Sequence, residues 1–268
     1  MWKKVAVAGG LLAIVSGIAA RSWAHEETVK APVVAKDVVV GDFKIMGNGT
    51  VRSWVQMGKN RQPTAVGITF SETALSGLPQ GVKGDSRRSS FEYSMKLPSQ
   101  AKATNIDHIS FDWEPLGHEP KGVYDVPHFD LHFYSMTMQE RAKIDGRGMA
   151  VQKLYKKPAA QYVPAAYILA PGTGVPRMGA HWVNTASPEL RGGKFTHTFV
   201  LGSYNGRFTF LEPMFAKSYL ETKPNVVVPI TQPKTLQKSG LFPTRYNVSY
   251  NAARHEYTIA LENWQWRK

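Results

Sequence analysis

The chain has 268 residues, of which 43% are hydrophobic and 11% aromatic, and this composition is typical of a packed globular protein rather than a disordered one. It contains no cysteine, which excludes disulfides, thiolate metal ligands and cysteine nucleophiles, so a metal site must be built from histidine, carboxylate or carbonyl groups. The formal net charge is +13, but the basic residues are spread along the chain without a recognisable binding module; we expect no specific nucleic-acid partner, and contact with anionic envelope polymers or lipid headgroups instead.

The N-terminal sequence predicts export. A short basic start precedes an apolar run over residues 5–20, and small residues end at Ala24. We interpret residues 1–24 as a cleaved signal peptide; cleavage after Ala20 and an uncleaved membrane anchor are the alternatives. Cleavage after Ala24 leaves a terminal His25, which can chelate copper as in the histidine brace of lytic polysaccharide monooxygenases. The mature protein is therefore expected to be periplasmic or secreted.

Residues 25–36 are expected to form a flexible lead, and residues 37–268 a single β-rich domain. Short alternating segments between glycine and proline turns predict a mainly β fold, with α+β as the alternative: antiparallel sheets in a sandwich or barrel-like core, with a few short peripheral helices. The predicted strands are 38–40, 43–46, 50–55, 65–70, 91–97, 109–113, 127–134, 179–183, 195–201, 207–211, 246–250 and 256–264. The predicted helical segments are a single turn within 71–79, then 137–144 and 212–221.

The stretch from His108 to Met136 gathers acids and histidines in an otherwise basic chain. Six of the 20 acidic residues lie between Asp107 and Asp130, with Lys121 as the one lysine or arginine among them. Half of the eight histidines lie in or beside the same window. Because carboxylate and imidazole groups are the usual ligands of divalent cations, this clustering predicts a metal site.

Residues 127–134 alternate as a half-buried strand does, so His128, Asp130 and His132 are expected on one face and the apolar residues between them in the core. Neighbours two apart on a face are about 6.6 Å from each other, within reach of one ion, whereas residues four apart are separated by about 13 Å. Asp130 can therefore pair with one histidine as a metal ligand, or accept a hydrogen bond from it and fix its tautomer.

The remaining ligands must come from other segments. His181, on its own short strand, and Glu212, at a predicted strand-to-helix junction, are the candidates, and His118 from the preceding loop is the candidate catalytic acid or base. We expect Asp130 and His128 to converge with His181 and Glu212, with His132 and His118 close by. The alternative is a structural hydrogen-bond network, in which Glu212 does no more than cap a helix.

Four motifs resemble those of a known family: W-E-P-L-G-H-E-P (113–120), Y-D-V-P-H-F-D-L-H-F-Y (124–134), G-A-H-W (179–182) and F-L-E-P-M (210–214). The family is an uncharacterised group of secreted bacterial proteins, whose described relative is a Thermus protein controlled by an extracytoplasmic-stress sigma factor. The resemblance covers roughly residues 42–264. It implies an extracytoplasmic location and a homo-oligomer, and it implies no catalytic residues, because the family is a domain of unknown function.

Together these patterns predict an extracytoplasmic protein with a His/carboxylate site for a divalent metal, with Zn²⁺ as the expected ion. In its sharper form the prediction is a metal-dependent hydrolase or lyase of unspecified substrate, in which a bound water is the nucleophile. The alternative is a non-catalytic envelope stress or binding protein whose His/Asp cluster is structural.

Overall fold

The computed structural model describes residues 37–84 and 89–268. The predicted signal peptide and flexible lead, residues 1–36, lie outside the described residues, and so does the copper-binding alternative at His25. Within the described ranges, every helix is too short or too polar to cross a membrane. The structure therefore bears on the predicted β domain and not on the export signal.

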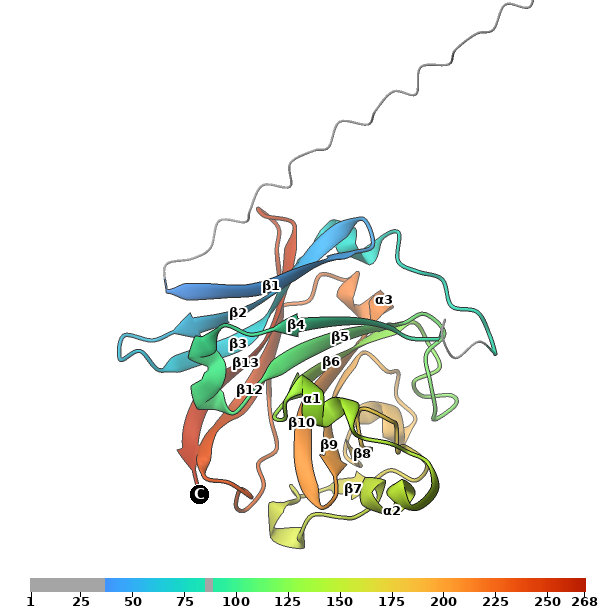
Figure 1. Cartoon of the computed structure of the whole chain (residues 1–268). Helices are drawn as coiled ribbons and strands as arrows, with labels where there is room; N and C mark the ends of the chain where they lie inside the picture. Colours follow the sequence, from blue (N-terminus) through green and yellow to red (C-terminus); the bar gives the residue numbers. More distant parts are fainter. Residues whose placement is uncertain (1–36, 85–88) are drawn as a thin grey trace, which may run out of the picture. The chain divides into compact units, whose positions relative to one another are not determined.

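Two antiparallel sheets make up the described chain (Figure 1). The six-stranded sheet has the order β1 (Val38–Met46), β2 (Gly49–Met57), β3 (Pro63–Ser71), β13 (Glu256–Arg267), β12 (Gly240–Asn251) and β11 (Val226–Pro229). The seven-stranded sheet has the order β4 (Phe91–Lys96), β5 (His108–Glu114), β6 (His128–Tyr134), β10 (Arg207–Ala216), β9 (His197–Tyr204), β8 (Ala180–Asn184) and β7 (Tyr167–Leu169). The mainly β prediction is confirmed, and the sheets remain two separate layers rather than a closed barrel.

The inner faces of the two sheets share one hydrophobic core. Phe70 on β3 lies 5.5 Å from Phe111 on β5, and Phe199 on β9 stacks on Tyr246 of β12 at 5.3 Å, both measured between ring centroids. The alternating apolar side chains of β6 belong to this core, as predicted: Phe129, Leu131 and Phe133. Burial of this apolar surface is the main term that stabilises the fold.

The helices are short and lie outside the sheets: α1 (Met138–Ala142), α2 (Val151–Leu154) and α3 (Lys217–Leu220). The helix predicted at 137–144 is confirmed as α1, which begins with a capping box between Thr137 and Glu140. The turn predicted within 71–79 is a 3-10 turn at Glu72–Leu75. Four more 3-10 turns are described: Ser99–Thr104, Gly148–Ala150, Ala160–Tyr162 and Pro188–Arg191.

The predicted helix at 212–221 is wrong over its first half. Strand β10 continues to Ala216, so Glu212 lies in the middle of a strand and caps no helix. Pro213 suggested the first turn of a helix because it lacks an N–H group. That N–H is also dispensable in β10: Pro213 is paired with Phe199 of β9, but the pairing of β10 with β6 passes from Leu211 to Met214 without it.

The outer face of β5 and β6 is polar and covered, whereas β9 and β10 carry a small apolar cluster with Val200 and Met214. The register of β5 against β6 places Ser110 opposite His132, Asp112 opposite Asp130, and Glu114 opposite His128. Every residue of β5 and β6 is buried, so both faces of these strands are shielded from solvent. Ionisable groups therefore lie in a low-dielectric layer beneath α1 and the loop that joins β5 to β6.

Candidate metal centre

Strand β6 carries three predicted site residues on one face, as its alternation indicates. His128, Asp130 and His132 are 0%, 4% and 1% exposed. The neighbouring strand β10 contributes Glu212, which is 1% exposed. Burial of this many ionisable groups is unfavourable unless each charge has a partner, so their mutual geometry decides what the site can do.

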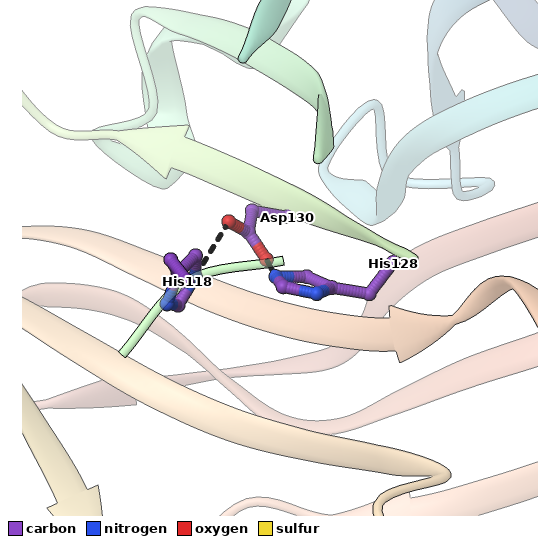
Figure 2. A group of neighbouring side chains, drawn as sticks. All are labelled: His118, His128 and Asp130. Carbon is purple, nitrogen blue, oxygen red and sulfur yellow. Dashed lines mark hydrogen bonds and ion pairs between the residues drawn. The ribbon is translucent and has the colours of Figure 1, made fainter. Parts of the chain in front are cut away.

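The outer triad consists of His118, His128 and Asp130 (Figure 2). Asp130 lies between the two rings: its Oδ2 is 3.3 Å from His118 Nε2, and its Oδ1 is 3.2 Å from His128 Nε2. One ligand atom from each residue lies within 4.8 Å of the others. The His118 side chain is 41% exposed, so this triad opens toward solvent.

The inner triad consists of His132, His181 and Glu212, again with ligand atoms within 4.8 Å of one another. Glu212 lies between the two rings, with Oε1 3.3 Å from His132 Nε2 and Oε2 3.7 Å from His181 Nε2. The three side chains are 1%, 16% and 2% exposed, in that order along the chain. This triad is more enclosed than the outer one.

All six predicted site residues are therefore brought together, but in two groups. We expected His128 and Asp130 to converge with His181 and Glu212. Instead, the two histidines of β6 join different groups, since residues four apart on a strand cannot reach one ion. His118, predicted as an acid or base, takes the third place in the outer triad.

Three of the histidines are oriented by backbone carbonyls. In His118, His128 and His181, Nδ1 lies within hydrogen-bond distance of a carbonyl oxygen, which can only accept. Each Nδ1 therefore carries a proton, and in the neutral ring Nε2 keeps its lone pair, directed at a carboxylate. The acceptors are the carbonyls of Glu119, Val126 and Thr173, at 2.7, 2.7 and 2.8 Å.

Several facing atoms make no hydrogen bond within the described part of the chain. They include His128 Nε2, Asp130 Oδ1, both ring nitrogens of His132, and Glu212 Oε2. Unsatisfied buried polar atoms are costly. Ligands about 2.0–2.1 Å from a tetrahedral Zn²⁺ lie about 3.3–3.4 Å from each other, so nitrogen–oxygen separations of 3.2 and 3.3 Å fit the geometry of a zinc site.

Comparison with known proteins adds one match. Residues 58–113 match a family model described as TTHB210-like, hypothetical protein TTHB210. No curated protein and no solved structure matches the chain. The TTHB210-like segment runs from the end of β2 to Trp113 on β5, and it agrees with the resemblance to an uncharacterised family. Because both triads lie beyond this segment, the match assigns no role to their residues.

The ionisation of the inner triad makes cation binding dependent on pH. Burial lowers the pKa of His181 to about 4, so its ring is neutral at pH 7 and its Nε2 can bind a metal. Burial would also lower the pKa of His132, but Glu212 and Asp112 outweigh it and raise that pKa to about 9. Burial raises the pKa of Glu212 to about 8 despite the opposing charge of His132. A metal ion would therefore displace protons from this triad.

In the outer triad, the carboxylate is strongly acidic. Burial would raise the pKa of Asp130, but His128 and His118 hold it well below its usual range. Burial would lower the pKa of His118, yet its hydrogen bond to Asp130 and the charge of that carboxylate raise it to about 10. Asp130 is therefore ionised over the physiological pH range, and a cation competes with the proton of His118 for it.

Asp112 also belongs to the site, although we did not predict it as a site residue. Its Oδ2 lies 3.2 Å from His132 Nδ1, and its Oδ1 accepts a hydrogen bond from Ser110. A carboxylate behind a metal-binding histidine fixes the ring and increases its basicity. The alternation of β5, which places Asp112 and Ser110 on one face, is the sequence signal that could have identified this role.

Arg141 is linked to the inner triad through Tyr134, and we did not predict this role. Its guanidinium lies 4.3 Å above the ring of Tyr134, and that ring stacks on His132 at 5.4 Å. The same guanidinium binds Glu92 through two hydrogen bonds of 2.8 and 3.0 Å. At 2% exposure, Arg141 is a buried cation that fixes α1 to the polar face of the sheet.

Proposed function

We propose that this chain is a divalent-metal-binding protein and that its two triads hold Zn²⁺. The observation that carries the proposal is the set of buried nitrogen and oxygen atoms that face each other at zinc-ligand spacing without hydrogen bonds. Imidazole and carboxylate ligands suit this ion. In a purely structural network, these side chains would satisfy one another, and Nε2 of His128 and Oδ1 of Asp130 do not.

The outer triad has the composition of a catalytic site. Three protein ligands leave a fourth position of a tetrahedral ion open, and the exposed ring of His118 places that position near solvent. Zinc held there would supply Lewis acidity to a bound water or substrate. His118 and His128 keep their rings fixed by backbone carbonyls, so the chain contributes a preorganised geometry. This supports a metal-dependent hydrolase or lyase as the sharper form of the proposal.

The inner triad suits a non-catalytic role. Its ligands are nearly enclosed, so an ion there would link β6, β8 and β10 rather than meet a substrate. A closed metal site adds its binding free energy to folding. A binding or envelope stress protein that uses its metal only for stability is therefore the second candidate, and the enclosure of this triad favours it.

The expected test is a melting curve with and without metal. Zn²⁺ that binds the folded chain stabilises it by about 2.7 kcal/mol at 100 times the Kd, so the melting temperature should rise by several degrees with Zn²⁺ and fall with a chelator. Mg²⁺, which prefers all-oxygen ligands, is the control and should have a much smaller effect. Identical melting curves with Zn²⁺ and with chelator would leave the two triads as a structural network.

We further propose that the protein functions outside the cytoplasm, because its N-terminal residues have the pattern of a signal peptide. A homo-oligomer, and contact with anionic envelope polymers or lipid headgroups, belong to the same proposal. The mass of the exported protein should lack residues 1–20 or 1–24. A mass that includes Met1 would instead favour a membrane anchor.

A further inference from the structure

A cavity of about 620 Å³ lies between the two sheets. Phe133 and Leu211 line it from the seven-stranded sheet, and Phe242 and Trp264 from the six-stranded sheet. Its volume falls within the range of about 300–1,000 Å³ that small-molecule sites occupy. These walls are apolar, so the interior of the cavity suits a hydrocarbon group.

None of the six triad residues lines the cavity. Phe133 follows His132 on β6, and Leu211 precedes Glu212 on β10. Because successive strand residues point to opposite faces, these two walls lie on the opposite side of the sheet from the inner triad. Phe210 also lines the cavity, and its ring lies 4.9 Å from the ring of His132 and 5.3 Å from that of His181, so the cavity and the inner triad are neighbours that share no residue. Binding in the cavity therefore does not require a metal ligand.

Two cations flank the cavity where it meets solvent. Arg207 and Lys238 both line it and are both exposed, whereas none of the described lining residues is an aspartate or glutamate. Neither cation makes a hydrogen bond or ion pair within residues 37–84 and 89–268, although Glu140 on α1 is close enough to feel the charge of Arg207. The cavity thus combines apolar walls with two available positive charges.

Two polar side chains of the wall, Gln237 and Trp264, are already hydrogen-bonded within the chain. Gln237 accepts a hydrogen bond of 2.8 Å from the Phe208 amide and donates one of 2.8 Å to the Gly206 carbonyl. The indole nitrogen of Trp264 donates to the Leu261 carbonyl at 3.2 Å. The strongest polar attraction available to a ligand therefore comes from the cations at the mouth.

We propose that this cavity binds a single-chain amphiphile with an anionic head group, of the chemical class of a fatty carboxylate. The hydrocarbon tail lies between the sheets, where burial of apolar surface provides the main attraction. The carboxylate lies at the mouth, where Arg207 and Lys238 donate charge-assisted hydrogen bonds. This is a second binding function, independent of the metal proposal.

The test is a calorimetric titration with laurate, compared with dodecanol and dodecyltrimethylammonium, which share its twelve-carbon chain. Laurate should bind one molecule per chain, and the neutral and cationic amphiphiles should bind at least about tenfold more weakly, because they lack the charge-assisted hydrogen bonds. Arg207→Gln combined with Lys238→Gln should weaken laurate binding by a similar factor. The matched control, Lys59→Gln with Arg61→Gln, removes the same two charges from an exposed turn and should leave it unchanged.

A cavity-filling variant, Leu211→Trp, should abolish binding of laurate. Because that change can disrupt the core, the surface pair at Arg207 and Lys238 provides the test that is independent of folding. No heat from laurate, equal affinity for dodecanol, or laurate binding unaffected by the loss of both cations would each overturn the proposal. His128→Ala should leave laurate binding intact, because His128 contacts His118, Asp130 and Phe195 and none of these lines the cavity; this separates the result from the fate of the metal proposal.

Discussion

Replacing His181 by alanine is expected to lower the affinity of the inner triad for Zn²⁺ by about 100-fold or more. Loss of a residue that merely orients a ligand costs about 10–100-fold, and His181 would be a ligand itself. His128→Ala should have the same effect on the outer triad. Because the triads share no residue, each variant should lose one of two ions, and the stoichiometry measured by calorimetric titration with Zn²⁺ distinguishes them.

The matched control is His255→Ala. This histidine is 72% exposed and pairs with Glu72, away from both triads, so its removal should leave two ions bound. A His181→Ala variant that retains both ions at wild-type affinity would contradict the assignment of the inner triad. Loss of both ions from either single variant would instead mean that the six residues form one centre.

Replacing Arg141 by methionine is expected to destabilise the fold by about 2 kcal/mol, less than the cost of removing one partner of a fully buried ion pair because the Glu92 side chain is 25% exposed. Methionine retains the apolar stem but removes two hydrogen bonds to Glu92, which keeps only the exposed Arg177 as a cation, and leaves the face of Tyr134 without its cation. Chemical denaturation measures the loss. Arg147→Met is the control, because its side chain is 90% exposed and surface ion pairs contribute little. A loss below about 1 kcal/mol for Arg141→Met would show that Arg141 does not hold α1 on the sheet.

The ion pair between Arg141 and Glu92 also makes the stability of the fold depend on pH. Burial would raise the pKa of Glu92, but its hydrogen bonds to Arg141 and Ser94 outweigh burial and lower it from 4.5 to about 2. A carboxyl whose pKa is lower in the folded state contributes stability that is full above pH 4.5 and is lost as the pH falls toward 2. The wild-type protein should therefore lose stability faster than Arg141→Met within this window.

Local patterns predicted much of the fold. The alternation of β6 predicts which residues face the core and which face the polar side, and both assignments agree with the burial of Phe129 and the grouping of Asp130 with histidines. The hairpin of β12 and β13 follows from two alternating segments around a short turn. These features depend on near neighbours in sequence, where periodicity carries the information.

The division of the six site residues into two triads could not be predicted from such local patterns. It depends on β6 lying between β5 and β10, and β10 comes more than 70 residues later in the chain. Glu212 was placed on a helix because Pro213 suits a helix start as well as a gap in strand pairing. Arg141 was overlooked because the sequence of α1 indicates a helix and not the surface that it covers.

Anomalous diffraction at the zinc absorption edge, from crystals of the protein grown with Zn²⁺, tests the central claim most directly. Two peaks are expected, one within bonding distance of His118, His128 and Asp130, and one within bonding distance of His132, His181 and Glu212. Ligand distances should be about 2.0–2.2 Å. If well-ordered crystals show both triads in place and no anomalous peak at either, these residues form a hydrogen-bonded structural network, and the protein is not a metal-binding protein.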